Sequence, residues 1–199
     1  RLRRYSAGQV LILNGDKSEF IYYILRGKVK QYDVTYRGDE IILHVFQPPA
    51  FFPMSQAINK SVNSFIYEAE TDIEIRQAPS DDVIQFIHDN PDVMYDLLSR
   101  LYKGMDAILG RTVQLMSGSA KTRLIYELLE DARRFGKTQK DGTLLLKINE
   151  KELGARAGLS RETVSRELHK IKGENILLQN KSIVIQDLDA LKKQSENSL

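Results

Sequence analysis

Cysteine is absent from this 199-residue sequence. Its absence excludes disulfide bonds, cysteine-ligated iron–sulfur clusters, thiolate-ligated haem and thiol redox sensing within this chain. Histidine occurs only three times, at scattered positions, so the sequence shows no metal-ligand cluster. A P-loop and a Gly-x-Gly-x-x-Gly fingerprint are missing as well. These gaps argue against an enzyme, and no cofactor is expected.

The sequence also lacks a long apolar run and a secretory signal. A membrane-spanning helix needs roughly 18 or more apolar residues in succession, so neither a membrane span nor export is predicted. We therefore expect a cytoplasmic protein. The chain starts at Arg1 rather than at methionine, which is consistent with a missing N-terminal piece.

Net charge is small, at +2, but the charges are unevenly distributed. Residues 119–199 carry 16 Lys and Arg against 12 Asp and Glu, whereas residues 1–118 carry 13 against 15. The C-terminal part is therefore the better candidate for binding a polyanion. Apolar residues make up 42% of the chain, enough to form a buried core.

Residues 5–78 are rich in β-strand formers. Short runs such as FIYYIL and EIILHVF are dense in β-branched and aromatic residues. Glycines at turn positions, including Gly15 after Asn14 and Gly27 after Arg26, separate these runs. Several short strands at roughly even spacing predict an antiparallel sandwich or roll. A short helix is expected to follow over residues 80–90.

Residues 92–116 form a long helical pattern without internal proline. Its apolar residues fall in heptad columns, with Thr112 interrupting one of them. The pattern predicts a seam between two subunits, formed by Met94, Leu98, Leu101, Met105, Ile108 and Leu115. The alternative is a helix that packs on its own β-domain. Residues 116–119, small and polar, are expected to form a hinge.

Residues 148–172 carry the pattern of a helix-turn-helix, and a further helix is expected before it. Ser119 is expected to cap a helix that ends at Gly136. Asn149, with Glu152 three residues later, has the arrangement of a capping box at the start of a short helix. Ser160 then caps a second helix after a tight, glycine-containing turn, and two short helices joined in this way form a helix-turn-helix.

The second helix of this motif divides into two sides. Val164, Leu168 and Ile171 recur at helical spacing and form the expected buried stripe. In a helix-turn-helix, the N-terminal part of the second helix enters the DNA major groove. There, Arg bonds guanine bidentately, Glu accepts from cytosine and Ser bonds either type of base edge. The expected base-reading residues are Arg161, Glu162, Ser165 and Arg166.

Further polar side chains suit contacts to the DNA backbone, which position a protein without reading sequence. The candidates are Ser160, Thr163, His169, Lys170 and Lys181. The last of these lies at the tip of an expected hairpin, ILLQNKSIVIQ, which would form a wing. Before the helix-turn-helix, GKTQKDGT is expected to be a loop and TLLLKI a short strand.

An alternative interpretation of the second helix is an ordinary solvated face. Glu162 and Arg166 are four residues apart, so the carboxylate can hold the guanidinium, and such pairs contribute only about 0.2–0.5 kcal/mol on many exposed helices. Because the apolar stripe lies on the opposite side of a capped helix-turn-helix, we favour DNA recognition. A second alternative is an effector-sensing or scaffold protein whose helix-turn-helix makes protein contacts.

The whole chain resembles the Crp/Fnr family of bacterial transcription regulators. The resemblance is carried by YSAGQVLILNGD, IYYILRGKV and YRGDEIIL in the β-rich part, by NPDVMYDLLSRL, and most specifically by LSRETVSREL. It implies an α+β fold with an antiparallel, jelly-roll-like β-roll of the cyclic-nucleotide-binding type over residues 1–90. A dimerisation helix and hinge over 91–118 and a winged helix-turn-helix over 119–199 would follow. The implied partners are double-stranded DNA, a second copy of the chain and RNA polymerase.

Two branches of the family place their base-reading residues differently. The cAMP-responsive branch is matched here by Arg161, Glu162 and Arg166, and the fumarate–nitrate branch by Glu162, Ser165 and Arg166. Both sets are present, so the resemblance implies half-sites that share a TGA core.

The phosphate-binding cassette of cAMP-binding members is not preserved. Pro53 stands where the family has glycine and has no amide hydrogen to donate. Met54 replaces the Glu that takes the ribose hydroxyl, and Asn63 replaces the Arg that neutralises the phosphate. We therefore do not expect cAMP binding. Haem would need His44 or His88 as a ligand and is not expected either.

The cassette region is instead apolar and aromatic. Two interpretations remain open for it. One is a filled core, since aromatic stretches usually serve packing. The other is a pocket for a less charged small-molecule effector. The candidate lining residues are Phe52, Met54, Ser64 and Tyr67.

Overall fold

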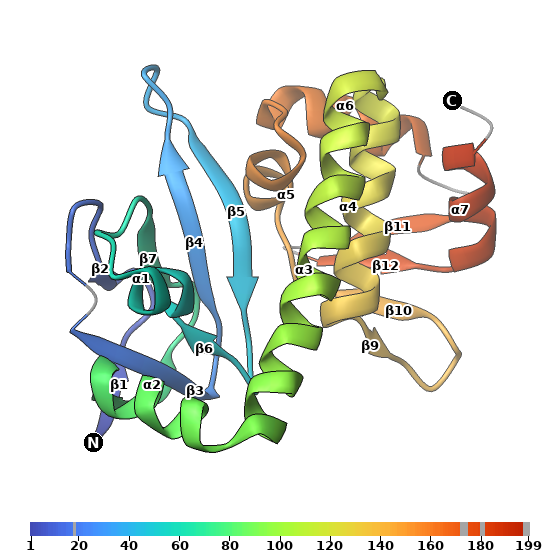
Figure 1. Ribbon diagram of the computed structural model, residues 1–199. Coiled ribbons are helices and arrows are strands. Elements are labelled where there is room, and N and C mark those ends of the chain that lie inside the picture. Colours follow the sequence, from blue (N-terminus) through green and yellow to red (C-terminus); the bar gives the residue numbers. More distant parts are fainter. Residues whose placement is uncertain (18, 172–174, 180–181, 197–199) are drawn as a thin grey trace. The chain divides into compact units, whose positions relative to one another are not determined.

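The computed structural model describes residues 1–17, 19–171, 175–179 and 182–196 (Figure 1). The chain forms two compact units, Arg1–Tyr102 and Lys103–Leu199. The division falls inside a single helix of 27 residues, α3 (Pro91–Ser117). Among the described residues, no helix is long and apolar enough to cross a membrane.

The first unit is built on two four-stranded antiparallel sheets, as expected for a β-roll. One sheet has the order β1-β8-β3-β6 and the other β2-β7-β4-β5. The first contains β1 (Leu2–Tyr5), β8 (Ile73–Pro79), β3 (Phe20–Arg26) and β6 (Phe51–Phe52). The second contains β2 (Val10–Ile12), β7 (Ile66–Ala69), β4 (Val29–Val34) and β5 (Glu40–Phe46).

Alternation along these strands places aliphatic side chains in the core between the sheets. Ile24 on β3 lies opposite Ile75 on β8, and both are fully buried. Val29 on β4 and Ala69 on β7 form the matching pair of the other sheet and are also fully buried. Fully burying a side chain of the size of Val or Ile contributes about 1.5–3 kcal/mol, so these pairs help to hold the two sheets together.

Two helices complete the strand-rich part of the unit. α1 (Met54–Asn59) follows β6, and α2 (Ser80–Asp89) follows β8. The sequence analysis expected α2 but not α1. Six residues are too few to show helical periodicity, so tertiary contacts rather than local pattern stabilise α1.

The turn between β3 and β4 depends on glycine at position 27. Gly27 has φ +86°, a backbone conformation that L-residues rarely adopt. A Cβ atom placed there would lie 2.3 Å from the carbonyl oxygen of Asp72 and 2.7 Å from Ile73 Cγ2. The chain therefore needs glycine here both for its backbone angle and for close approach to the loop before β8.

The second unit contains the helices α4 (Ala120–Phe135), α5 (Glu150–Ala157), α6 (Arg161–Ile171) and α7 (Leu188–Glu196). A four-stranded antiparallel sheet has the order β11-β12-β10-β9. Its strands are β11 (Ile176–Gln179), β12 (Ser182–Ile185), β10 (Leu144–Leu146) and β9 (Lys137–Thr138). The pairing of β11 with β12 gives the expected hairpin, and the winged helix-turn-helix fold is confirmed.

One local expectation for this unit was wrong. The segment GKTQKDGT was expected to be a loop, but β9 at its start pairs with β10, with Leu144 opposite Thr138. A strand of two residues has no alternation that a sequence can display, so the hairpin forms because β10 offers it an edge.

We predict that Gly27→Ala destabilises the β-roll more than Gly38→Ala. Both glycines have φ near +85°, but a Cβ at Gly38 meets nothing within 4 Å. Gly38→Ala should therefore cost only the backbone strain, about 1 kcal/mol, whereas Gly27→Ala adds overlap with backbone and should cost about 3 kcal/mol or more. Urea unfolding of the whole chain measures both, and equal losses would contradict the close approach at Gly27.

Candidate nucleic-acid interface

The helix-turn-helix forms because its two helices are capped as the sequence predicts. The Asn149 side chain accepts a hydrogen bond from the Glu152 amide at 2.9 Å, and the Glu152 carboxylate accepts from the Asn149 amide at 3.2 Å. This capping box satisfies two amides that lack partners inside α5. At the start of α6, the Ser160 hydroxyl accepts from the Thr163 amide at 3.2 Å.

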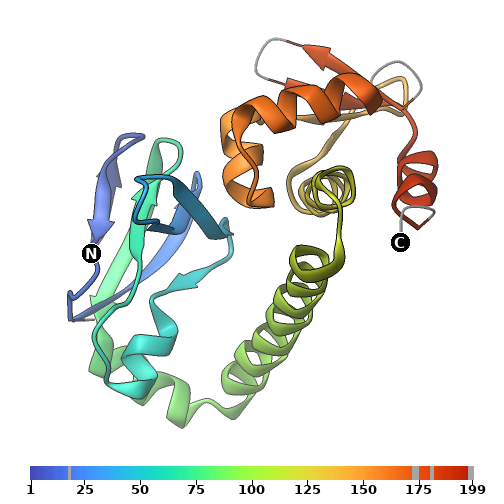
Figure 2. The same cartoon turned by 90° about the horizontal axis from the view of Figure 1, so that it is seen from above.

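The turn between α5 and α6 is closed by two glycines. Gly158 ends α5 in the left-handed conformation, with φ 63°. The Leu159 amide donates to the Gly154 carbonyl at 2.9 Å, and a Cβ at Gly154 would lie 2.6 Å from the Leu159 carbonyl oxygen. The chain therefore passes so close to α5 that only glycine fits at position 154. Figure 2 shows α5 and α6 as neighbours joined by this short turn.

The buried side of α6 is the one that the sequence predicts. Val164 and Leu168 are fully buried, and Ile171 is 3% exposed. They pack in the core of the second unit with side chains from α4, α5, β10, β12 and α7. Burial on this scale contributes about 1.5–3 kcal/mol for each side chain and fixes the rotation of α6 about its axis. The opposite face of α6 is consequently held toward solvent.

The four predicted base-reading residues lie on that solvent-facing side. Arg161, Glu162 and Arg166 are exposed, and Ser165 is half-buried. The Arg161 guanidinium lies 3.5 Å from the Glu150 carboxylate of α5, a weak exposed contact that leaves it movable. Arg166 donates to the Thr163 hydroxyl at 3.3 Å. The structure thus brings together, on two turns of one helix, groups that can donate to and accept from base edges.

The pairing that the spacing of Glu162 and Arg166 allows is not among the ion pairs of the described residues. Glu162 lies in the first turn of α6, where backbone amides lack partners. Hydrogen bonds from its own backbone N–H and from the Ser160 hydroxyl lower the pKa of its carboxyl. The carboxylate is therefore drawn to the N-terminus of the helix, away from Arg166, and stays ionised as an acceptor.

The predicted backbone-contacting residues are placed around the same end of the motif. Ser160 is exposed and Thr163 is half-buried. His169 is held by a hydrogen bond of 2.8 Å from its Nδ1 to the Ser165 carbonyl, and Lys170 forms a 2.8 Å ion pair with Glu167. The prediction for Lys181 falls outside the described residues.

The cassette region of the β-roll is packed with aromatic rings. The rings of Phe52 and Tyr67 stack at 5.4 Å with an interplanar angle of 11°, and both side chains are almost fully buried. Tyr22 stacks on Phe52 at 5.3 Å, and Phe46 lies 5.5 Å from it. Burial raises the pKa of the Tyr67 phenol to about 12, so it stays neutral. This packing favours the filled-core interpretation at Phe52 and Tyr67.

The remaining cassette positions lack the groups that bind a cyclic phosphate. Met54 is half-buried at the start of α1, and Ser64 is exposed. Asn63 is 1% exposed and donates its side-chain amide to the carbonyls of Leu13, at 2.7 Å, and Phe65. Its polar group is therefore used to join two loops of the roll.

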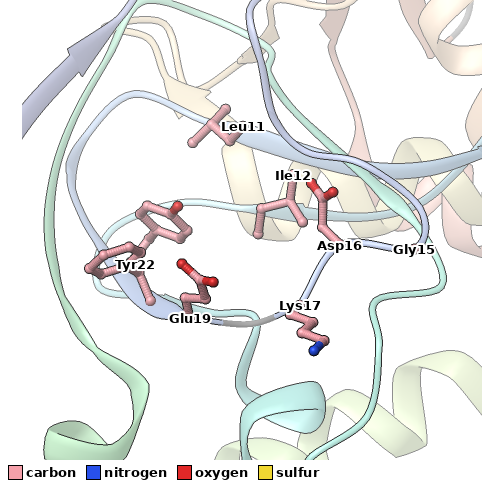
Figure 3. Close-up of a pocket in the computed structure, with 8 residues that line it drawn as sticks. Leu11, Ile12, Gly15, Asp16, Lys17, Glu19 and Tyr22 are labelled. Carbon is pink, nitrogen blue, oxygen red and sulfur yellow. The ribbon is translucent and has the colours of Figure 1, made fainter.

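Two polar hollows lie elsewhere on the roll. The first, of about 440 Å³, is lined by Leu11, Ile12, Gly15, Asp16, Lys17, Glu19, Phe20 and Tyr22. Figure 3 shows Glu19 and Tyr22 on one side of it and Asp16 on the other. The second, of about 750 Å³, is lined by Arg4, Tyr5, Ser6, Arg26, Gly27, Thr71, Asp72, Ile73 and Glu74. Neither hollow is lined by the four predicted effector-pocket residues.

The predicted seam residues form an apolar face that the chain leaves uncovered. Their exposed fractions lie between 44% and 60%, for Met94, Leu98, Leu101, Met105, Ile108 and Leu115. Thr112, which interrupts the pattern, donates its hydroxyl to the Ile108 carbonyl at 2.9 Å. Exposure of so many large aliphatic side chains on one helix is typical of a surface that binds a partner.

Buried charges join the helices of the second unit, and the sequence analysis did not single them out. Arg111 on α3 forms a bidentate ion pair with Glu127 on α4, with distances of 2.6 and 2.9 Å. Arg156 on α5 binds Asp131 on α4 at 2.6 Å, and both side chains are 5% exposed. The sequence signal that could have indicated these pairs is the presence of two carboxylates, Glu127 and Asp131, four residues apart on an otherwise apolar face of α4.

Two protein-family models match successive parts of the chain. Residues 2–90 match the cyclic nucleotide-binding domain, and residues 122–194 match the Crp-like helix-turn-helix domain. The chain belongs to the Crp/Fnr family of transcription regulators. The matched domains and relatives are those of regulators, not of enzymes.

Two curated relatives match this chain over nearly its whole length. The chain is 26% identical over 196 residues to the transcriptional regulator SdrP of Thermus thermophilus, and the match covers 97% of this chain and 93% of that protein. It is 27% identical over 187 residues to the cAMP-activated global transcriptional regulator CRP of Salmonella typhimurium, covering 92% and 89%.

A crystal structure of a Crp/Fnr-family regulator from Thermus thermophilus shares the fold. Its TM-score is 0.80 at 24% identity, and the match covers 100% of both chains. This likeness supports the β-roll, the long helix and the winged helix-turn-helix.

We predict a pH dependence of stability from Glu127. Burial raises the pKa of its carboxyl from 4.5 to about 7, although Arg111, and more weakly Arg156, favour the charged form. Between those pH values the folded chain holds a proton that the unfolded chain has released. The contribution of Glu127 to the free energy of unfolding should therefore be fully present below about pH 4.5 and be lost as the pH rises to about 7.

Chemical unfolding of the wild type and Glu127→Gln from about pH 4.5 to about pH 8 tests this sign. The wild-type free energy of unfolding should fall relative to that of the variant as pH rises. Glu130→Gln is the matched control, because Glu130 forms a more exposed pair with Arg133 on the same helix. If the wild-type free energy of unfolding instead rose relative to that of the variant with increasing pH, the attraction of Arg111 for the carboxylate would outweigh the effect of burial.

Proposed function

We propose that this Crp/Fnr regulator acts in the cytoplasm as a homodimer that binds palindromic DNA, with a TGA core in each half-site. The observation that carries the proposal is α6 itself. Its aliphatic side is buried, and its N-terminal half presents Arg161, Glu162, Ser165 and Arg166 on the opposite side. The N-terminal half of the second helix is the part of a helix-turn-helix that reads base edges.

The exposed seam of α3 supports the homodimer. Six large aliphatic residues at heptad spacing stay 44–60% exposed in the single chain. Helices with such a repeat bury their seams against each other, and a second copy supplies an identical seam by twofold symmetry. A twofold dimer presents two copies of α6, which requires a palindromic site.

The chemistry of the cassette supports a regulator that does not respond to cAMP. A cyclic phosphate needs amide donors and a cation, and charge-assisted contacts supply most of its affinity. Pro53 has no amide hydrogen, and Asn63 carries no charge and is already bonded to Leu13 and Phe65. Control of transcription also implies RNA polymerase as a partner, as the family membership suggests.

Selection of bound duplexes from a random DNA pool tests the DNA-binding proposal. We expect palindromes that contain TGA and TCA half-sites. Arg166→Ala should weaken binding to the selected site by about tenfold or more, because a bidentate contact to guanine contributes about 1–3 kcal/mol. Arg133→Ala, which removes an exposed arginine from α4, is the control and should change affinity by less than about twofold.

Two results would contradict the proposal at different points. Recovery of no palindrome would contradict DNA recognition by a dimer and would favour the scaffold alternative. Recovery of a palindrome with unchanged binding by Arg166→Ala would leave DNA binding standing but would show that the base-reading assignment is wrong.

Calorimetric titration of the whole chain with cAMP tests the effector proposal. We expect a Kd weaker than about 1 mM, since the charge-assisted contacts are missing. The cAMP-activated relative from Salmonella typhimurium serves as the positive control. Saturable binding of cAMP at micromolar concentration would overturn the proposal.

A further inference from the structure

The C-terminal half of α3 packs on α4 inside the second unit. The Tyr126 hydroxyl donates to the Ala107 carbonyl at 3.3 Å. A Cβ at Gly110 would lie 2.7 Å from that hydroxyl, so glycine leaves the space that Tyr126 occupies. α3 and α4 are therefore in direct contact, and the contact involves a backbone carbonyl as well as side chains.

The strongest polar contact between these helices is the Arg111–Glu127 pair. Both guanidinium-to-carboxylate distances, 2.6 and 2.9 Å, are those of charge-assisted hydrogen bonds. The Glu127 side chain is 2% exposed and that of Arg111 24% exposed. A two-pronged pair fixes direction as well as distance, so it sets the angle at which α4 meets α3.

A second buried pair continues from α4 to the helix-turn-helix. Asp131 lies one helical turn after Glu127 and binds Arg156 of α5 at 2.6 Å. The Arg156 guanidinium also lies 5.4 Å from the centre of the Phe135 ring, over which a cation is attracted. α5 in turn is joined to α6 by the close turn at Gly154. The chain of contacts thus runs from α3 through α4 and α5 to α6.

The end of the seam also touches this motif. A Cβ at Gly158 would meet Leu115 Cδ2 at 3.4 Å, so this predicted seam residue borders the helix-turn-helix turn. Arg123 of α4 reaches the Gly158 carbonyl at 3.5 Å. Met105, Ile108 and Leu115, half of the predicted seam, belong to the same compact unit as α6.

Buried ion pairs are poor sources of net stability, because desolvation cancels most of the attraction. Removing one partner is nevertheless costly, since it leaves a buried charge without compensation. Apolar side chains could fill the same space without this cost. Two such pairs in succession therefore suit a role in orientation, which is what directional contacts provide and apolar packing does not.

We propose that the Arg111–Glu127 and Asp131–Arg156 pairs, together the ion-pair relay, are positioning residues that hold α6 at a fixed orientation to the dimer seam and so set the half-site spacing that the dimer accepts. The inference rests on the proposed function, because it requires a twofold dimer on DNA. One added base pair moves a half-site by about 3.4 Å and roughly 35° about the DNA axis. A rigid link between seam and α6 cannot follow both changes.

The test is a series of duplexes with two identical selected half-sites, whose spacer changes in steps of one base pair. For the wild type, a change of one base pair from the best spacer should weaken binding by about tenfold or more. Glu127→Gln and Arg111→Lys should reduce that penalty to less than about threefold. The first keeps the shape of the side chain, and the second keeps the charge but loses the fork.

The controls separate orientation from general stability. Glu130→Gln on the same helix should keep the wild-type spacer penalty. The double variant Arg111→Lys with Glu127→Gln should show no larger effect than either single variant, because both remove one contact. Arg111 is partly exposed, so Arg111→Lys provides a folded variant even where Glu127→Gln melts early.

The outcomes distinguish this inference from the proposed function. If the wild-type chain binds no palindrome, both the proposed function and this inference are contradicted. A wild type that binds with strict spacing, beside folded Arg111→Lys and Glu127→Gln variants that keep the same spacing penalty, overturns the inference alone. In that case the relay would serve stability only.

Discussion

The second unit depends on two carboxylates that α4 buries one turn apart. Glu127 and Asp131 both lie in the interior, where an unpaired charge is costly, and each has an arginine beside it. Their partners, Arg111 and Arg156, come from α3 and α5. The need to pair buried charge therefore decides which helices α4 contacts and in which direction, while aliphatic packing supplies the stability.

α3 carries this arrangement beyond the second unit. Its first turns belong to the β-roll unit, where Arg100 donates to the Pro49 carbonyl at 3.0 Å, and its last turns belong to the unit that contains α6. Its apolar face, meanwhile, stays uncovered in the single chain. α3 thus has contacts in both units and carries the surface proposed for dimerisation.

The sequence predicted the parts of the site that local rules govern. Caps at Asn149 and Ser160 and the buried stripe on α6 follow from spacing along one helix, and the structure confirms them. The strand-rich first part followed from evenly spaced runs of β-branched and aromatic residues, and the family resemblance was carried most specifically by the α6 motif. The sequence analysis missed α1 and β9 because both elements are too short to show a helical or strand periodicity. The Glu162 carboxylate, which the spacing could have paired with Arg166, is instead hydrogen-bonded by its own backbone N–H and by the Ser160 hydroxyl.

By itself the sequence determined the longer elements, the caps of α5 and α6 and the apolar side of α6, because these properties depend on residues close together along the chain. Only the tertiary structure decided which charges are buried and with whom they pair, since Arg111 and Glu127 are 16 residues apart and Asp131 and Arg156 are 25 apart. Only the fold showed that aromatic rings fill the cassette region around Phe52 and Tyr67. The physical reason is that burial belongs to the assembled chain, and the pairing of buried charges follows from burial.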